Sequence, residues 1–133
     1  MRRERFEEFV SKINLLQELE TYERSKITDC LTTAKYHDGE VVIEQGDVGN
    51  KFYFIEHGNA QATKSGEVVY EYKENDYFGE LALLQDEPRA ASIVAIGDLT
   101  VAWIDRFAFK RLLGPLEGVL KRNASKYEEF VKN

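Results

Sequence analysis

The sequence predicts an α+β fold in which an antiparallel β barrel or jelly roll is flanked by helices at both ends. Apolar residues recur at three- and four-residue steps near the N-terminus, which is the period of a helix. Short alternating runs separated by turn residues then fill the middle of the chain, and the helical period returns near the C-terminus. A chain of 133 residues has the length of one domain. We therefore expect a single domain, 1–133, with N-terminal helices over 1–33, a barrel over 34–105 and C-terminal helices over 106–133.

The N-terminal helices are predicted from one apolar stripe and one candidate cap. The stripe consists of Phe6, Phe9, Val10, Ile13, Leu16 and Leu19. Thr21 is the predicted N-cap of a second helix, with Arg24 instead of Glu at the capping-box position. That second helix is expected to turn Ile27, Cys30 and Leu31 toward the core.

The barrel is predicted from six short runs and from the turn residues between them. The runs are Glu40–Glu44, Phe52–Glu56, Ala60–Thr63, Val68–Tyr72, Ala91–Ile96 and Thr100–Ile104. The turn signals that separate them include Asp38-Gly39, His57-Gly58-Asn59, Ser65-Gly66 and Gly97-Asp98. Among these, Ser65-Gly66 has the composition of a tight hairpin turn.

The C-terminal helices are predicted on either side of a glycine–proline pair. A short helix from Arg106 to Leu113 stops at Gly114-Pro115, which ends one helix and begins the next. The last helix has an apolar face formed by Leu116, Val119, Leu120, Ala124, Tyr127 and Val131.

Composition and charge argue against several function classes. The formal net charge is −6, whereas nucleic-acid binding needs a basic surface, so we expect no nucleic-acid partner. No apolar run approaches the length of a membrane span, and the charged start after Met1 does not resemble a signal peptide. The single cysteine, Cys30, cannot form an internal disulfide. These features predict a cytoplasmic protein with no membrane partner.

The segment Phe78–Ser92, with the sequence FGELALLQDEPRAAS, carries the chemistry. Gly79 permits close approach of a ligand to the backbone, and the helix formers after it would point N–H groups back toward that glycine. Such a helix N-terminus binds anions, and Arg89 adds a planar cation that suits phosphate oxygens. The small side chains of Ala90 and Ala91 leave room beside Arg89.

Glu80 distinguishes this segment from a simple phosphate site. Its carboxylate would repel a phosphate, so it needs another partner on the ligand, such as a sugar hydroxyl, and the set then describes a nucleotide. One nearby cation, with no lysine-bearing Gly-rich loop, indicates a small phosphate charge rather than a triphosphate. On spacing alone a structural alternative stays open. Glu80 could stabilise its own helix dipole, and Arg89 could pair with Glu80 or Asp86.

This segment closely resembles the phosphate-binding cassette of cyclic-nucleotide-binding domains. Residues 46–55, GDVGNKFYFI, followed by Gly58, resemble the first barrel motif of that family. The stretches 111–115 (RLLGP) and 120–123 (LKRN), with Tyr127, resemble the C-terminal helices of the second such domain in regulatory subunits of cAMP-dependent protein kinase. The resemblance covers essentially the whole chain. It implies an eight-stranded antiparallel jelly-roll barrel with a short cassette helix, flanked by N-terminal and C-terminal helices.

The resemblance also implies a role for each cassette residue in binding cAMP. Glu80 accepts the ribose 2′-hydroxyl, Arg89 clamps the cyclic phosphate, and Gly79 lets the sugar approach. Backbone N–H groups around Ala82 and over 90–91 complete the phosphate cradle. The implied ligand-binding set is Phe78, Gly79, Glu80, Leu81, Ala82, Arg89, Ala90, Ala91 and Tyr127, with no catalytic residue, no metal and no cofactor besides the ligand cAMP.

The contacts to the base depend more on the resemblance than on the residues themselves. Tyr127 matches the aromatic cap that stacks on the base, although an aromatic residue at helical spacing is otherwise more typical of a core position. Relatives selective for cGMP tend to carry Thr directly after the cassette arginine. Here that position is Ala90, which favours cAMP, while Ser92 two residues later leaves the selectivity open.

The resemblance implies a cAMP sensor and not an enzyme. In a full-length regulatory subunit, cAMP would rearrange the C-terminal helices and release the kinase catalytic subunit. The chain is expected to be part of a larger protein, and the isolated domain to be monomeric. The alternatives are the cyclic-nucleotide sensor of a channel, an exchange factor or a cGMP-dependent kinase, and a cassette repurposed for another nucleoside.

Two further function classes lack the residues they need. A transcription factor with the same sensor would need a helix-turn-helix, and none is predicted after the last helix. A metal-dependent barrel enzyme would need clustered His and carboxylate ligands. The histidines are His37 and His57, which lie beside separate turns and are expected at the surface.

Overall fold

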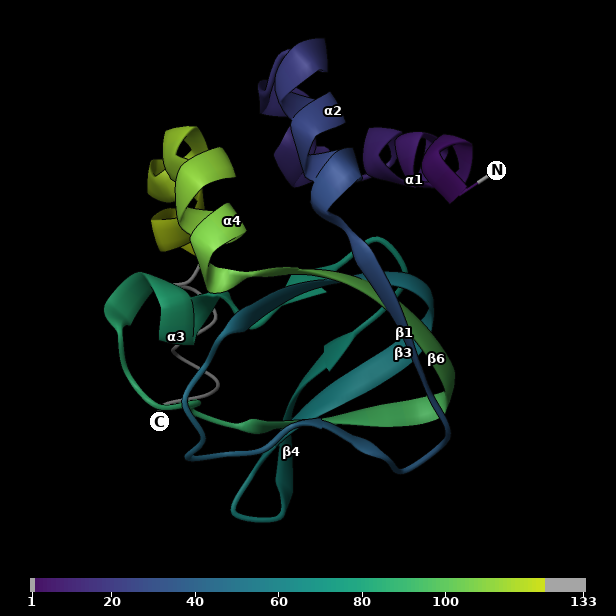
Figure 1. The fold of residues 1–133 in the computed structure, drawn as a ribbon. Helices are drawn as coiled ribbons and strands as arrows, with labels where there is room; N and C mark the ends of the chain where they lie inside the picture. Colours follow the sequence, from purple (N-terminus) through teal and green to yellow (C-terminus); the bar gives the residue numbers. More distant parts are fainter. Residues whose placement is uncertain (1, 124–133) are drawn as a thin grey trace.

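A computed structural model describes residues 2–123, with side chains from Phe6 onward, and shows helices gathered at one end of a curved antiparallel sheet (Figure 1). The helices are α1 (Arg2–Ser11), the 3-10 helix η1 (Asn14–Glu18), α2 (Thr21–Cys30), α3 (Glu80–Gln85), α4 (Arg106–Leu112) and the 3-10 helix η2 (Gly114–Leu116). Residues 117–123 are helical as well. The strands are β1 (Thr32–Tyr36), β2 (Val41–Ile43), β3 (Lys51–Lys64), β4 (Glu67–Tyr72), β5 (Tyr77–Phe78) and β6 (Ser92–Asp105).

The sheet has the order β1-β6-β3-β4, with β2 also paired to β6 and β5 paired to β3. Strands β3 and β6 are 14 residues long and pair with each other along most of their length. Their register shifts on both sides of His57. The sheet of residues 2–123 has six strands, two of them unusually long, which is roughly consistent with the predicted eight. The jelly-roll architecture is thus confirmed, although hydrogen bonds do not close the sheet within residues 2–123.

Two predicted strand breaks are wrong, because the chain bends there without leaving the sheet. Gly58 has a φ of 96°, and a Cβ added to it would lie 2.3 Å from the backbone carbonyl oxygen of Asp98. Gly97 has a φ of 69°. Gly58 therefore lets the two strands approach closely, Gly97 supplies a left-handed backbone conformation, and β3 and β6 continue through the positions predicted as turns.

Other local predictions have mixed outcomes. The Ser65-Gly66 hairpin is confirmed, with positive φ at both residues, as a primed turn between β3 and β4 requires. Thr21 is not the N-cap: it is the first residue of α2, and Glu20 before it has the extended cap conformation. The backbone N–H of Glu20 donates to the Glu23 carboxylate at 2.9 Å, so Glu23 supplies the acidic capping contact.

The core has two parts that meet across β3. Phe52 and Phe54 pack against the helices, whereas Tyr53 and Ile55 point into the barrel. This strand is buried on both faces, which explains its continuous apolar run in place of alternation. All six residues of the N-terminal apolar stripe are buried, although the helix is interrupted after Ser11 and resumes as η1.

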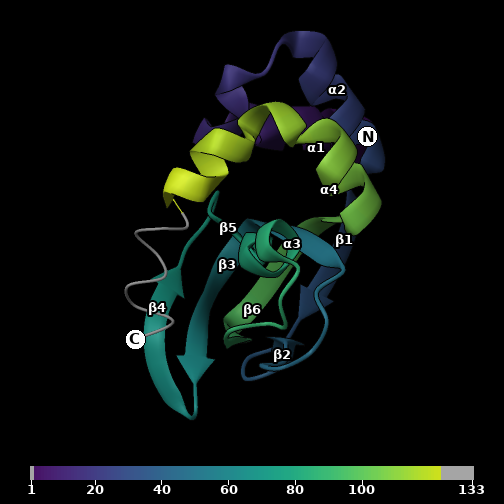
Figure 2. The same cartoon turned by 90° about the vertical axis from the view of Figure 1, so that its left-hand side faces the viewer.

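Helix α3 lies at the side of the barrel, beside the start of α4 (Figures 1 and 2). The short helix after β6 ends at Leu112, close to the predicted stop, and residues 117–123 begin the predicted last helix. No helix within residues 2–123 is long and apolar enough to cross a bilayer.

Candidate functional site

The cassette helix α3 is held in place by the two-residue strand β5. Phe78 pairs with Tyr53 of β3, and their rings stack with centroids 5.0 Å apart and planes 15° from parallel. Gly79 follows in the left-handed region with a φ of 93° and is the N-cap of α3. A side chain is strained in that conformation, and a Cβ there would lie 3.0 Å from the Arg89 guanidinium. The glycine thus turns the chain sharply and places Glu80 at the first position of the helix.

Arg89 is fixed through both its side chain and its backbone. Arg89 is 8% exposed, and its guanidinium donates to the carbonyl oxygens of Gly79 at 2.6 Å and Lys51 at 2.8 Å. The Arg89 N–H donates to the Asp47 carbonyl, and the Gly46 N–H donates to the Arg89 carbonyl. These contacts engage two of the five guanidinium N–H groups and neutralise none of the charge. Arg89 is a buried, pre-oriented cation.

Gly49 supplies the space beside this cation. A Cβ added to Gly49 would lie 2.6 Å from Cβ of Ala82 and 2.8 Å from Cζ of Arg89. Residues 46–50, which precede β3, form the glycine-rich loop. Real Cβ atoms do not approach so closely, so only glycine at position 49 permits this loop to lie against both α3 and Arg89.

Glu80 is a buried carboxyl with a perturbed pKa. The residue is 6% exposed, and burial raises the pKa of its carboxyl group from 4.5 to about 7. The backbone N–H groups of Glu80 and Leu81 and the Arg89 guanidinium oppose that shift and favour the carboxylate. Burial also lowers the pKa of Arg89 from its usual value. Two opposite charges are therefore kept partly dehydrated at one end of the barrel.

The predicted pairing alternatives for Glu80 and Arg89 are not what the geometry shows. No ion pair joins these two side chains, both of which lie in the described part of the chain. Asp86 pairs with Arg106 and with Lys110 of α4, and not with Arg89. Glu80 instead accepts from the backbone N–H groups at the start of α3, as the helix-dipole alternative expects, and Arg89 donates to backbone carbonyl oxygens.

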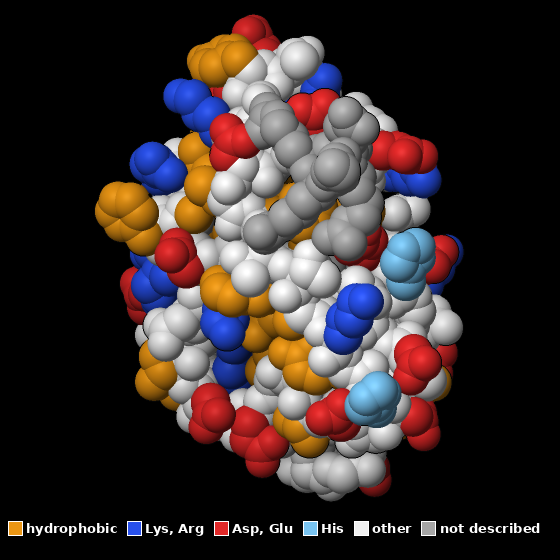
Figure 3. Space-filling view, turned by 45° about the vertical axis from the view of Figure 1, so that its right-hand side comes forward, with side chains coloured by type: hydrophobic (Ala, Val, Ile, Leu, Met, Phe, Trp, Pro, Cys, Tyr) orange, Lys and Arg blue, Asp and Glu red, His pale blue; other side chains and the backbone are white. Residues whose placement is uncertain are grey.

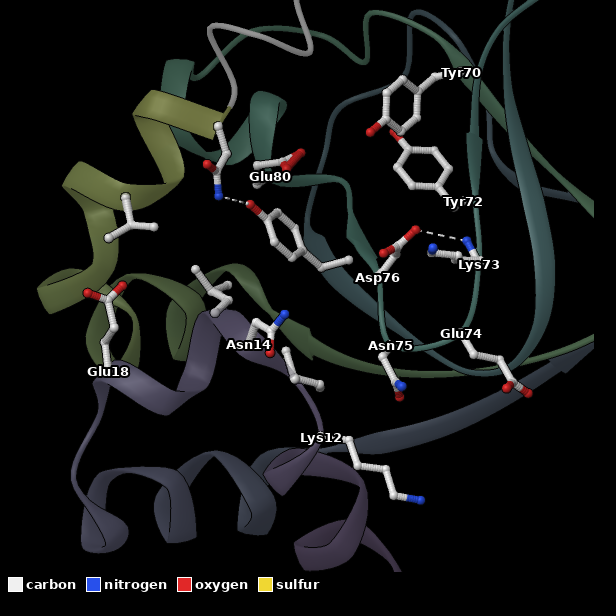
Figure 4. Close-up of a pocket in the computed structure, with 15 residues that line it drawn as sticks. Lys12, Asn14, Glu18, Tyr70, Tyr72, Lys73, Glu74, Asn75, Asp76 and Glu80 are labelled. Carbon is white, nitrogen blue, oxygen red and sulfur yellow. Dashed lines mark hydrogen bonds between the residues drawn. The ribbon is translucent and has the colours of Figure 1, made fainter.

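Glu80 lies between two hollows in the surface. The smaller one is lined by Ile43, Gly79, Glu80, Leu81, Ala82, Arg89, Ala90, Ala91 and Ile93. The larger is a groove of about 640 Å³ that runs from Glu80 past Tyr70 and Tyr72 (Figure 4). Asn123, from the C-terminal helix, also lines this groove and donates to the Tyr77 hydroxyl at 2.9 Å. The end of the described helix is thereby linked to the strand that leads into the cassette.

The structure brings eight of the nine predicted site residues together, at 78–82 and 89–91. Phe78 is fully buried in the barrel core, so its side chain supports the cassette from beneath. Tyr127 lies outside the described residues. Sequence reasoning did not single out Gly49, the Lys51 carbonyl, or the apolar walls Ile43 and Ile93. The resemblance of the glycine-rich loop could have indicated the first, but a carbonyl contact leaves no mark on residue type.

The remaining candidates for chemistry lie away from this site. His37 and His57 are exposed, as predicted, and each is within 3.5 Å of a carboxylate, from Asp98 and Glu74 respectively. Both appear in pale blue on the surface drawn in Figure 3, where acidic and basic side chains are interspersed. Within residues 2–123 no group of three or more His, Cys, Asp or Glu side chains could hold a metal ion.

A cation held by backbone carbonyls, a carboxyl able to accept a hydroxyl, and small side chains between them suit a compact phosphorylated sugar. Comparison with known proteins agrees with this chemistry. Residues 33–114 match the model of the cyclic nucleotide-binding domain. A cAMP-dependent protein kinase regulatory subunit from Colletotrichum orbiculare is 50% identical over 97% of this chain, which corresponds to 33% of that protein.

Two solved structures share both fold and sequence with the chain. The structure described as cAMP-bound PfPKA-R (141-441) has a TM-score of 0.94 and 44% identity, over 98% of this chain and 46% of that one. The structure described as Sp-2Cl-cAMPS bound to PKAR CBD2 has a TM-score of 0.92 and 44% identity, over 98% of this chain and 90% of that one.

A further relative differs in its ligand. The regulatory subunit of a cAMP-independent protein kinase A from Trypanosoma cruzi, bound to guanosine, has a TM-score of 0.89 and 30% identity, over 97% of this chain and 48% of that one. The same fold therefore holds different nucleosides and nucleotides, and the ligand depends on the site residues. The family match spans more than half of the chain and is joined by a relative that the chain covers almost completely, so this chain belongs to the cyclic nucleotide-binding domain family.

Proposed function

We propose that residues 1–133 form one cAMP-binding sensor domain of a cAMP-dependent protein kinase regulatory subunit. The observation that carries the proposal is the buried Arg89 guanidinium, held by two carbonyls beside a buried Glu80 at the start of α3. In this assignment Arg89 binds the cyclic phosphate, Glu80 accepts the ribose 2′-hydroxyl, and N–H groups near Ala82 and over 90–91 complete the cradle.

The electrostatics support a monoanionic phosphate. Burying a guanidinium without an anionic partner is costly, and one phosphate charge would compensate it. A triphosphate would bring several negative charges next to the carboxyl group of Glu80, which is buried. The cavity lined by alanines and glycine is correspondingly small.

A nucleoside ligand is the second candidate, because the Trypanosoma cruzi relative is bound to guanosine. A nucleoside could use Glu80 for its ribose but would leave the buried Arg89 charge without an anion. The energetic argument therefore favours a phosphate ligand for this chain. Ala90, in place of a hydroxyl-bearing residue after Arg89, favours cAMP over cGMP.

We assign a regulatory role and no catalytic step. In the full-length protein, cAMP would be covered by Tyr127 from the C-terminal helix, and the shift of that helix would release the kinase catalytic subunit. The coupling is reciprocal, so the kinase would weaken cAMP binding by the same factor. A cytoplasmic location and a monomeric isolated domain remain predictions of the same proposal.

Calorimetric titration of the Arg89→Lys variant tests the phosphate assignment. A lysine ammonium is a point charge without the planar fork by which the guanidinium contacts both carbonyl oxygens and would bind a phosphate bidentately. We expect cAMP to bind about 100-fold more weakly, which corresponds to roughly 2.7 kcal/mol. Arg111→Lys, an identical substitution on α4 outside the two hollows that Glu80 lines, is the control and should bind as the unsubstituted chain does. Equal affinities for the two variants would refute the phosphate assignment.

A further inference from the structure

Arg106 joins three segments that are far apart in the sequence. It is the first residue of α4. Its guanidinium pairs with Asp86 at the C-terminal end of α3 and donates to the Gly49 carbonyl at 2.7 Å. Its backbone N–H donates to the Asn50 carbonyl at 2.7 Å. Arg106 therefore forms hydrogen bonds with two consecutive carbonyl groups of the glycine-rich loop and an ion pair with the residue that ends the cassette helix.

The contacts of Arg106 lead directly to the phosphate-binding cation. Gly49 packs against the Arg89 guanidinium, since a Cβ there would lie 2.8 Å from Arg89 Cζ. Asp86 is three residues before Arg89, in a left-handed conformation that ends α3. The positive charge of Arg106 is also near enough to lower the pKa of Arg89. Arg106 thus contacts the loop and the helix end that flank Arg89, without lining either hollow described above.

We propose that Arg106 is a positioning residue that sets the geometry of Arg89 for the cyclic phosphate and ties the cradle to α4. This inference rests on the proposed function. When Arg106 holds Gly49 and Asp86, the loop and the cassette keep the Arg89 guanidinium between them. Because Arg106 begins α4, a displacement of α4 moves the cradle, and binding of phosphate restrains α4 in return.

Lys110 offers a matched control within the same cluster. Its ammonium also pairs with Asp86, at 3.8 Å, from the next turn of α4. It makes no contact with the Gly49 carbonyl, which accepts from Arg106. Lys110→Gln therefore removes one positive charge and one partner of Asp86, while the hydrogen bonds from Arg106 to the glycine-rich loop remain.

A double-mutant cycle with calorimetric cAMP titration tests the inference. We expect Arg106→Gln to weaken cAMP binding about tenfold in the otherwise unsubstituted chain, and less than threefold in the Arg89→Lys background, because Arg106 acts through Arg89. Arg106→Lys keeps the charge but lacks the planar fork, so we expect it to weaken cAMP binding less than Arg106→Gln does in the otherwise unsubstituted chain. Lys110→Gln should change the affinity less than twofold. Thermal melting without ligand establishes that each variant is folded. If Arg106→Gln does not fold, Asp86→Asn replaces it as a milder change to the contact between Arg106 and Asp86.

Three outcomes overturn the inference. The same loss from Arg106→Gln in both backgrounds would show a general effect on the fold, and equal losses for Arg106→Gln and Lys110→Gln would show an effect of charge alone. An unchanged affinity for Arg106→Gln would show that the cradle does not depend on this residue. Failure of the unsubstituted chain to bind cAMP would instead overturn the proposed function, and this result is read before any variant is compared.

Discussion

Replacing Glu80 by glutamine should stabilise the protein without ligand while weakening cAMP binding. The pKa of this carboxyl is raised from 4.5 to about 7, chiefly by burial. A carboxyl whose pKa is higher in the folded than in the unfolded protein stabilises the fold at acid pH, and that stabilisation is lost as the pH rises from 4.5 through 7. The shift corresponds to a cost on the order of 3 kcal/mol above pH 7. Glutamine has the same shape and no charge, so the cost disappears.

The binding effect has the opposite sign. A charged acceptor forms a stronger hydrogen bond than a neutral one, so loss of the carboxylate should weaken the bond to the ribose 2′-hydroxyl by about 1.5 kcal/mol, or roughly tenfold in affinity. The affinity of the unsubstituted chain should also rise between pH 6 and pH 8 as Glu80 ionises, whereas that of Glu80→Gln should stay level over this range.

Urea unfolding at pH 5 and pH 8, with calorimetry at each pH, measures both effects. We expect Glu80→Gln to gain about 2–3 kcal/mol in free energy of unfolding at pH 8 and little near pH 5. Glu117→Gln is the control, because this exposed carboxylate pairs with Lys121 on the helix surface and should change stability by less than about 0.5 kcal/mol. A variant that is no more stable than the unsubstituted chain at pH 8 would show that Glu80 is not held in an unfavourable environment. Tight binding of 2′-deoxy-cAMP, equal to that of cAMP, would contradict its assignment to the ribose.

Three further substitutions test other parts of the site. Gly49→Ala should lower the free energy of unfolding by about 1–3 kcal/mol through overpacking and weaken cAMP binding at least tenfold. Gly118→Ala, where an added Cβ meets nothing within 4 Å, is the control and should have neither effect. Equal melting temperatures and affinities for the two variants would contradict the packing argument. Tyr127→Ala should increase the cAMP dissociation rate in stopped-flow experiments while the melting temperature of the ligand-free protein stays the same, and an unchanged dissociation rate would remove its role as a cap. Ala90→Thr should narrow the affinity ratio between cAMP and cGMP in parallel titrations, and an unchanged ratio would count against the selectivity argument.

The sequence predicted the fold where local pattern and tertiary packing agree. The Ser65-Gly66 hairpin depends on backbone conformations that its own residues favour, and it formed as expected. Gly58 and Gly97 carry the same local signal, but both lie in the irregular stretch between the pairs His57–Thr100 and Asn59–Ile96, and strand pairing resumes on each side of them. Residues 32–36 gave no strand signal because β1 is largely exposed or half-buried, and its place depends on pairing with β6.

The charged side chains of the site were easier to predict than the backbone and long-range contacts that hold them in place. Glu80 and Arg89 were identified because two side chains of opposite charge are unusual in a segment of small and apolar residues. Lys51 holds Arg89 through a carbonyl oxygen, and every residue type has one, so no pattern could have indicated it. Arg106 was assigned to a helix start and nothing more, because its contacts with Gly49 and Asp86 join positions 57 and 20 residues away.

A single calorimetric comparison of cAMP, cGMP and adenosine on the unsubstituted chain tests the central claim most directly. The claim is that the buried Arg89 and Glu80 are arranged for the two ends of one cyclic nucleotide. It predicts that cAMP binds most tightly, cGMP more weakly, and adenosine weakest, because adenosine leaves the Arg89 charge without an anion. Adenosine binding as tightly as cAMP, or more tightly, would contradict the claim and show that the cassette serves a nucleoside.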